Sequence, residues 1–456
     1  MAFYCLSFGA TLLFMGTTSR YYPEIEFVNH ASFIVQHENF RILVDPWLTG
    51  YAFNLGWALQ LPTPQKYLRI DSLNNVTHII FTHEHPDHFN PVWLSTIPEE
   101  KRREIVVFFQ KTKDRRVINF CERLGFQIIE LPPRKEFQIS SEISLVINPV
   151  PFIDSFQVLK IRDFVILNLN DCVTSKIDLL WVKRQFNVDL MFTQFSYANW
   201  AGDPGETEYR KDIALEALEK LKQQINFLKP TYVIPFASFV YFSHEENVHL
   251  NDQRNTVLDA IYEIEAAGAI PVVLSPGDIW NPKNQWDNTL PIKKYMDSMN
   301  VPQAEELEKA KSVSKGELIS LAKKYKGRIE LNNRLALWLI AKYPFRVGRT
   351  MYLYLNDMNE TIEFNPQNGK IAFLEGKNPK ARIEMASDSF ALILKFDYGS
   401  STLSINGRMR ASSASYKELL RAFAVPNLNS GGRLLSINLL VEYNFVHRAI
   451  RRVIAG

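Results

Sequence analysis

Short apolar runs alternate with amphipathic segments over the first 280 residues of the chain. β-Branched and aromatic runs predict strands at 106–109, 127–130, 143–148, 156–161, 164–169, 190–193, 232–235 and 270–274. Apolar positions at helical spacing predict helices at 91–96, 113–124, 177–186, 208–227 and 256–267. This interleaving predicts two sheets whose outer faces are covered by helices.

The pattern changes near residue 292. Residues 293–344 are rich in lysine and glutamate at helical spacing, and Ser314 with Glu317 resembles a capping box, so a helical linker is expected there. Strand-like alternation returns at 349–404, for example at 351–355 and 391–396. Residues 345–456 are therefore expected to form a small α+β domain, with strands first and helices last.

Both ends of the chain have apolar segments. Residues 3–15 are apolar but fall short of the roughly 20 residues that span a membrane, and no basic residue precedes Arg20. We therefore expect residues 1–22 to be an N-terminal extension and residues 23–292 to form the first domain. Residues 434–454 are expected to form a helix that closes the C-terminal domain. Because this segment carries three arginines, a peripheral membrane contact is the alternative.

Composition narrows the class of protein. The chain has 456 residues, 46% of them hydrophobic and 22% charged, as in globular proteins of two or three domains. A formal net charge of +3, with scattered basic residues, argues against nucleic-acid binding. Cys5, Cys121 and Cys172 have neither metal nor disulfide spacing, so a reducing, cytoplasmic location is expected.

The densest chemistry follows the apolar run 76–81. Residues 82–88 contain three imidazoles and an aspartate at close spacing, namely His83, His85, Asp87 and His88. Imidazole nitrogens and carboxylate oxygens are ligands for Zn, Fe and Mn. His83 and His85 can serve one ion while Asp87 and His88 face a second. A solvated charged loop is the alternative, which we disfavour because the chain has only nine histidines.

The spacing H-x-H-x-D-H resembles the metal motif of the metallo-β-lactamase superfamily. The resemblance implies an αββα sandwich with a mono- or dinuclear metal site, and strands at 26–35 and 41–48 ahead of the motif. It also implies that Asp45 orients the metal loop without being a ligand. The C-terminal domain is similar to the sterol-carrier-like domain that some superfamily members carry.

The resemblance implies further ligands after later strands. Asp171 is expected to bridge the two ions, and His244 to be the last ligand, with His249 as a competitor. The superfamily's third histidine has no counterpart, because no histidine lies between His88 and His244. Asp154 occupies its place, either as a ligand that favours iron or manganese over zinc or as a turn residue.

Four segments point to one family within this superfamily. Residues 45–57, 170–172, 193–202 and 235–237 are similar to the catalytic region of the CMP-N-acetylneuraminate hydroxylase family. That family hydroxylates the N-acetyl group of a nucleotide-linked sugar and carries a Rieske iron–sulfur domain ahead of this region. The cysteines here lack Rieske spacing, so an oxygenase of this kind is expected to take electrons from another chain.

Three hypotheses follow. The first is a hydrolase in which two divalent ions bring the pKa of a bridging water toward ~7 and Asp87 orients that water or acts as its base. Its substrate would be a small polar N-acyl, phosphoester or nucleotide-sugar-like molecule. The alternatives are a dinuclear non-haem iron monooxygenase and a metal-binding protein without catalysis.

Two segments are expected to contact the substrate: the loop after Asp45 and the residues that follow strand 190–193. Their amide and aromatic groups suit a pocket wall that binds a polar ligand. For Tyr197 and Trp200 the alternative is that they are aromatic residues of the hydrophobic core. The expected contacts are Trp47, Asn54, Gln194, Tyr197, Asn199 and Trp200.

Overall fold

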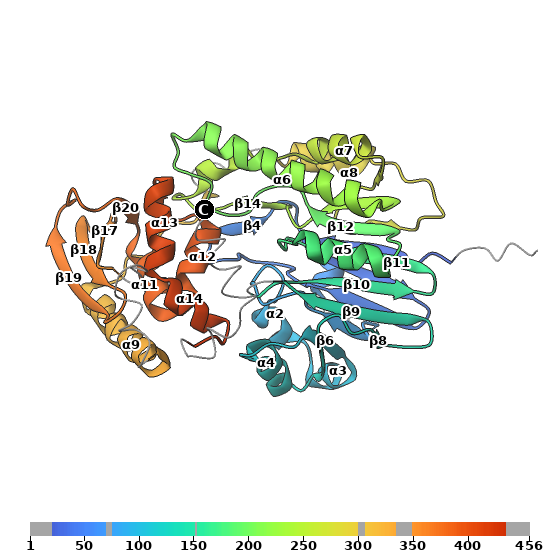
Figure 1. The fold of residues 1–456 in the computed structure, drawn as a ribbon, viewed down its shortest axis with the longest axis horizontal. Helices are drawn as coiled ribbons and strands as arrows, with labels where there is room; N and C mark the ends of the chain where they lie inside the picture. The colour runs from blue at the N-terminus through green and yellow to red at the C-terminus, as the bar shows by residue number, and fades with distance from the viewer. Residues whose placement is uncertain (1–20, 70–74, 151–152, 300–305, 334–348, 435–456) are drawn as a thin grey trace, which may run out of the picture.

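A computed structural model describes residues 21–69, 75–150, 153–299, 306–333 and 349–434. Figure 1 shows a large unit with central sheets and a smaller C-terminal unit beside it. The first sheet of the large unit has the order β16-β1-β2-β3-β5-β6-β7. Its strands are β1 (Glu24–Asn29), β2 (Ser32–His37), β3 (Phe40–Val44), β5 (His78–Ile80), β6 (Val106–Gln110), β7 (Gln127–Leu131) and β16 (Ile279–Trp280).

The second sheet has the order β15-β13-β12-β11-β10-β9-β8. Its strands are β8 (Phe137–Gln138), β9 (Ile143–Pro149), β10 (Ser155–Ile161), β11 (Phe164–Asn168), β12 (Leu190–Gln194), β13 (Tyr232–Phe236) and β15 (Ile270–Pro271). A separate ribbon pairs β4 (Trp57–Leu59) with β14 (Val240–Phe242).

Helices cover the outer faces of both sheets, as Figure 1 shows. Below the first sheet in that view lie α2 (Pro91–Thr96), α3 (Glu99–Glu104) and α4 (Arg116–Leu124). Over the second lie α5 (Lys176–Gln185), α6 (Thr207–Leu228), α7 (Val257–Ala266) and α8 (Thr289–Asp297). Two single turns complete the unit, α1 (Gln65–Leu68) and η2 (Val248–Asn251). The expected αββα sandwich is confirmed.

The alternation of side chains along the strands produces two hydrophobic cores, one between the sheets and one under the outer helices. In β2, Phe33 and Val35 point between the sheets, whereas Ile34 points to the outer face under α2 and α4. Successive side chains of a strand face opposite ways, so one apolar strand serves both cores. The sheet nearest the metal loop is therefore buried on both faces, which makes its strand ends rigid supports.

The sequence prediction for residues 26–35 is wrong in one respect. This segment is not one strand but a hairpin, in which β1 and β2 pair antiparallel around a turn at His30 and Ala31. His30 has a positive φ of 42°, which breaks the extended run. The apolar pattern on both sides of the turn hid it.

The C-terminal unit contains a five-stranded sheet of order β19-β18-β17-β20-β21 and five helices among the described residues. The strands are β17 (Met351–Leu355), β18 (Glu360–Asn365), β19 (Lys370–Glu375), β20 (Ile383–Met385) and β21 (Arg410–Ala411). The helices are α9 (Lys315–Asn333), α11 (Ser387–Lys395), α12 (Gly399–Asn406), α13 (Ser413–Ala422) and α14 (Ala424–Ser430).

Two expectations for this region differ from the structure. The run 391–396, read as a strand, lies mostly in α11, because buried Ser387, Phe390, Ala391 and Leu394 form one helical face. The segment expected as a linker is divided between two cores: Tyr295 of α8 packs in the first, and α9 packs in the second. The capping contact is present, since Ser314 Oγ accepts the Glu317 N–H at 3.3 Å.

No helix among the described residues is long and apolar enough to cross a membrane. Residues 1–20, most of the N-terminal extension, and residues 435–456, nearly all of the expected closing helix, lie outside the described residues.

Candidate metal centre

Parallel pairing brings several strand ends to one edge of the sandwich. β3 pairs parallel with β5 in one sheet, and β12 lies between β11 and β13 in the other. The residues just beyond these ends adopt positive φ: Asp45 at 42°, Asn170 at 40° and Ala237 at 48°. Non-glycine residues in this conformation cost about 1–3 kcal/mol each and cluster at functional sites. The edge is therefore the expected place for chemistry.

One group of candidate ligands consists of His83, His85 and Asp154, whose ligand atoms lie within 4.8 Å of one another. His83 Nε2 is 2.8 Å from His85 Nδ1. The Thr82 hydroxyl donates its hydrogen bond to Asp45. In its 2.9 Å contact with His83 Nδ1 the Thr82 oxygen is therefore the acceptor, and the imidazole N–H is the donor. Burial lowers the pKa of both imidazoles, which keeps them neutral, as metal binding requires.

A second group consists of His30, Asp87 and His88, again within 4.8 Å. Asp87 Oδ2 lies 3.2 Å from His30 Nε2 and 3.3 Å from His88 Nε2. Burial raises the pKa of Asp87, but His88 and His30 outweigh it and hold that pKa well below its usual range. Asp87 is therefore a carboxylate in this setting.

Asp171 lies between the two groups. Its Oδ1 is 3.9 Å from His83 Nε2 and 3.5 Å from His88 Nε2. Asn170 fixes this loop, because its side-chain oxygen accepts the N–H groups of Asp171 and Cys172 at 2.8 and 3.1 Å. Its amide also donates to the Ser155 carbonyl at 2.8 Å, which ties the loop to β10.

Asp45 supports the cluster from behind. Its carboxylate accepts the backbone N–H of Thr82 at 2.8 Å, the Thr82 hydroxyl at 2.6 Å and His88 Nδ1 at 2.9 Å. A carboxylate that accepts a hydrogen bond from the Nδ1–H group of a histidine orients the other ring nitrogen toward a metal. Asp45 therefore contacts both Thr82 and His88 of the loop that the resemblance expects it to orient.

The unpaired atoms of the cluster test whether a cation fits. His88 Nε2, Asp87 Oδ1 and Asp171 Oδ1 are buried without a hydrogen-bond partner. Such atoms cost about 1–3 kcal/mol each when left unsatisfied. Burial lowers the pKa of His88, yet the carboxylates of Asp87, Asp171 and Asp45 raise it well above its usual value. A cation in place of that proton would satisfy all three atoms, so the residues fit divalent ions.

His30 is the residue that sequence reasoning missed. It is buried, its Nδ1 has no hydrogen-bond partner, and its ring meets Trp47 edge-to-face with centroids 5.5 Å apart. Its backbone carbonyl accepts the Ala237 N–H at 3.2 Å, which joins the hairpin to the end of β13. A histidine beside Asn29, in the middle of an apolar run, was the available signal for a turn.

His244 is not part of either group. Its Nδ1 accepts the Glu246 N–H at 3.2 Å, which places the proton of the neutral ring on Nε2. Burial and nearby Arg408 lower its pKa to about 4. The Nε2 of His244 is buried without a hydrogen-bond partner, but the structure places the ring outside both groups, so it does not support the assignment of His244 as last ligand. His249, its competitor, contacts the Gly202 carbonyl through Nε2 at 3.1 Å, also outside the groups.

The expected substrate contacts divide into two sets. Trp47 borders His30 of the cluster, whereas Gln194 Nε2 donates at 3.4 Å to the carbonyl of Ala237, the residue whose N–H binds the His30 carbonyl. Trp47 is buried, as a residue in a pocket wall would be. Asn199 is exposed.

Tyr197 and Trp200 are core aromatics, which corrects their prediction as pocket residues. The Tyr197 hydroxyl donates to the Leu250 carbonyl at 2.5 Å, and Trp200 stacks on Tyr416 with centroids 4.3 Å apart. Asn54 lies in a turn at the boundary between the two units, where its carbonyl accepts an Arg408 N–H at 2.9 Å.

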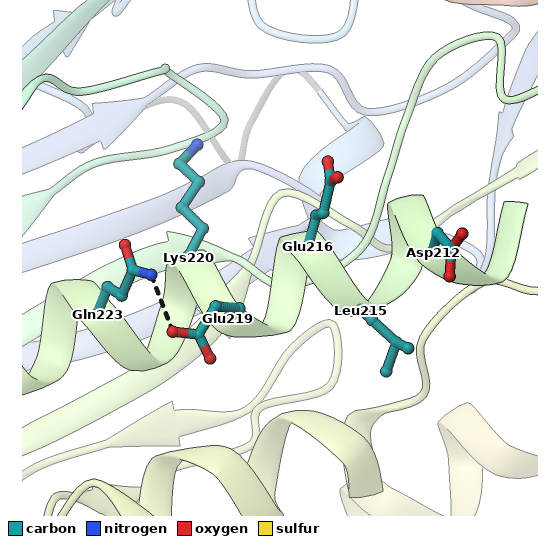
Figure 2. A pocket seen from close by; sticks show the side chains of 6 residues that line it. All are labelled: Asp212, Leu215, Glu216, Glu219, Lys220 and Gln223. Carbon is teal, nitrogen blue, oxygen red and sulfur yellow. Dashed lines mark hydrogen bonds between the residues drawn. The ribbon is translucent and has the colours of Figure 1, made fainter. Parts of the chain in front are cut away.

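A surface hollow on α6 lies apart from these residues (Figure 2). It is lined by charged, polar and apolar side chains of α6, and Glu219 accepts a hydrogen bond from Gln223 at 2.8 Å. None of the cluster residues lines it. Its residues are Asp212, Leu215, Glu216, Glu219, Lys220 and Gln223.

Comparison with known proteins agrees with this fold. Residues 24–171 match the family described as "Beta-lactamase superfamily domain". The large unit thus has the metallo-β-lactamase fold, and the family match covers its residues from β1 to Asp171.

The sequence also resembles particular enzymes. The cytidine monophosphate-N-acetylneuraminic acid hydroxylase of Xenopus laevis is 24% identical over 278 residues, which cover 57% of this chain and 44% of that protein. The chain thus spans less than half the length of this relative.

Two solved structures have a related fold. One, a metallo hydrolase from Ignicoccus hospitalis, is 15% identical with a TM-score of 0.41, covering 58% of this chain and 100% of that one. The other, the diiron β-hydroxylase CmlA of Streptomyces venezuelae, is 15% identical with a TM-score of 0.39, covering 57% and 53%.

Proposed function

We propose that this protein is a dinuclear metalloenzyme that uses iron to hydroxylate a small polar, N-acylated or nucleotide-linked substrate. The observation that carries the proposal is the donor set, in which Asp87, Asp154 and Asp171 lie among the histidines. A set so rich in carboxylates favours iron or manganese over zinc. The similarity to a hydroxylase over 57% of the chain supports the reaction, which reverses the order of our sequence-based hypotheses.

The residues divide between two ions. His83, His85 and Asp154 would hold one, Asp87 and His88 with His30 the other, and Asp171 would be shared, since it contacts His83 and His88. Bound iron would supply Lewis acidity and redox chemistry toward O₂.

Other residues would orient this set. Asp45 and Thr82 direct the imidazoles of His88 and His83 through the hydrogen bonds described above. Trp47 closes the cluster on the His30 side and excludes water there. The Gln194 amide, at the end of β12, is placed to hydrogen-bond a polar substrate group.

Hydroxylation needs reductant from outside. One oxygen atom of O₂ enters a C–H bond and the other leaves as water, which consumes two electrons and two protons. We propose that a separate iron–sulfur protein supplies the electrons. A cytoplasmic location is likewise a proposal, compatible with the buried free thiols of Cys121 and Cys172.

Hydrolysis of an N-acyl or phosphoester bond is the second candidate. The feature that favours it is Asp87, whose Oδ2 is engaged by His30 and His88 while Oδ1 is buried without a partner. In this alternative Oδ2 would hold the ion and Oδ1, not bound to it, would accept a proton from an attacking water.

Dependence on O₂ separates the two candidates. Iron-loaded protein with CMP-N-acetylneuraminate as probe and a reduced iron–sulfur protein as donor is expected to consume O₂ and release hydroxylated product. Zinc- or manganese-loaded protein without O₂ is expected not to cleave bis(p-nitrophenyl) phosphate. Anaerobic cleavage without reductant would instead establish the hydrolase, and inactivity in both assays with metal bound would support the non-catalytic alternative.

Asp154 provides a test of metal preference. The variant Asp154→Ala is expected to lose one metal equivalent, because the group of His83 and His85 then has no carboxylate of its own. Asp154→His is expected to shift the preference from iron toward zinc. Competition between the two metals, followed by elemental analysis, measures both effects. Unchanged content and preference in both variants would make Asp154 a turn residue.

A further inference from the structure

A strained turn stands beside the metal cluster. Phe53, Asn54 and Leu55 have φ values of 50°, 55° and 62°, three consecutive non-glycine residues in the left-handed region. Side chains with a Cβ disfavour this conformation, so such a run persists only where surrounding contacts impose it. Both units contact the turn: Ser243 Oγ of the large unit donates to the Leu55 carbonyl at 2.9 Å, and the C-terminal unit holds the carbonyls of Phe53 and Asn54.

Arg408 is the centre of those contacts. Its side chain is completely buried, and its NH1 donates to the Asn54 carbonyl at 2.9 Å. NH2 donates to both carboxylate oxygens of Asp388 at 2.8 Å, and Nε donates to Glu246 at 2.9 Å. A guanidinium with this many fixed partners has one orientation available.

Asn406 makes a parallel connection. Its amide donates to the Phe53 carbonyl at 3.0 Å, and its own carbonyl accepts the Asn247 amide at 2.6 Å. The approach is close: a Cβ on Gly56 would lie 2.4 Å from the Asn406 Cβ. The turn is therefore clamped against the C-terminal unit through two consecutive carbonyls.

The turn passes this constraint on to the cluster. The ring of Phe53 lies edge-to-face on His85, with centroids 5.5 Å apart, and on Trp57 at 4.5 Å. His85 belongs to the first group of candidate ligands. Loss of a hydrogen-bonded neighbour that orients a ligand costs about 10–100-fold in metal affinity in other sites, and the ring of Phe53 restricts the orientation of His85 by packing.

We propose that Arg408 of the C-terminal unit is a positioning residue for the metal centre: it clamps the turn 53–55, and Phe53 in turn orients His85. The C-terminal unit is then a part of the site and not an appendage. This inference rests on the proposed metal binding by His83, His85 and Asp154.

Cobalt titration tests it without an activity assay. Metal-free full-length protein is titrated with Co²⁺ in competition with a chelator, and the visible d–d spectrum is recorded at each step. The variants are Arg408→Lys, which loses the forked contacts, Phe53→Leu, and the two combined. Arg328→Lys is the matched control, because Arg328 binds Asp397 and the Leu394 carbonyl within the C-terminal unit.

Each single variant is expected to weaken one cobalt equivalent about tenfold and to change its spectrum. The combined variant should be no weaker than either single one, because both changes act through the same contact. Arg328→Lys should leave affinity and spectrum as in the wild type, whatever it does to folding stability. If Arg408→Lys fails to fold, Asp388→Asn replaces it in the same test, because Asp388 fixes the guanidinium of Arg408 at 2.8 Å.

Three outcomes overturn the inference. Wild-type affinity and spectrum in Arg408→Lys or Phe53→Leu would show that the turn does not orient His85. Effects that multiply in the combined variant would show that the residues act separately. If the wild-type protein binds no cobalt at all, the proposed metal centre is wrong as well. The first two outcomes contradict only the role of Arg408 and leave the proposed metal centre standing.

Discussion

The variant Asp171→Ala is expected to retain at most one of two metal equivalents and to lose catalytic efficiency on the order of a hundredfold or more. The reason is its position: Asp171 Oδ1 lies 3.9 Å from His83 Nε2 and 3.5 Å from His88 Nε2, one in each group of candidate ligands. Elemental analysis and the more productive of the two assays measure the effects.

Asp212→Ala is the matched control for this change. Asp212 is an exposed carboxylate on α6 that belongs to neither group of ligands. Metal content and activity should match the wild type there. Two full metal equivalents in Asp171→Ala would show that Asp171 is only a loop residue.

The variant Asp45→Asn is expected to weaken metal binding about 10–100-fold while the protein still folds. An asparagine side chain can still accept the Thr82 N–H, but it offers only one oxygen where Asp45 uses both. Its amide would oppose the Nδ1 proton of His88, which now points at Asp45 Oδ2 at 2.9 Å. His88 would then lose the support that directs Nε2 into the cluster.

Asp189→Asn controls for the loss of a buried carboxylate. Asp189 is buried, and its Oδ2 accepts the Val165 N–H at 2.9 Å, away from the metal loop. Both variants should lower the thermal unfolding temperature, whereas only Asp45→Asn should weaken metal binding. Equal metal affinity in Asp45→Asn and wild-type protein would contradict the supporting role of Asp45.

Local sequence patterns predicted the sandwich well, because its strands are apolar and its helices amphipathic. Helix α2 begins and ends where the sequence placed it, at Pro91 and Thr96, since proline at the first position is a strong start signal. The helix α11 was misread because the apolar run at 391–396 is too short to have a decisive period, and the hairpin at His30 was misread because apolar residues flank its turn on both sides.

The candidate site divides in a similar way. His83, His85, Asp87 and His88 share one loop, so their proximity followed from the sequence. Asp154 and Asp171 were expected at the same edge, and the structure brings both to the loop histidines. His30 and His244 were misjudged because their surroundings are tertiary: Ala237 ties the His30 turn to β13, whereas Glu246 fixes the tautomer of His244.

The role of the C-terminal unit could not be read from sequence at all. Arg408 and Asn54 are more than 350 positions apart, and nothing local marks either as a partner of the other. Only the folded chain shows that a guanidinium from one unit holds a turn of the other.

Anomalous diffraction from crystals of the protein, purified without added metal and measured at the iron, manganese and zinc edges, shows directly whether the centre holds two ions. A dinuclear centre gives two peaks: one among His83, His85 and Asp154, the other beside Asp87 and His88, with Asp171 between them. No peak at this cluster in metal-replete crystals, or a peak at His244 in place of the second, would contradict the dinuclear centre.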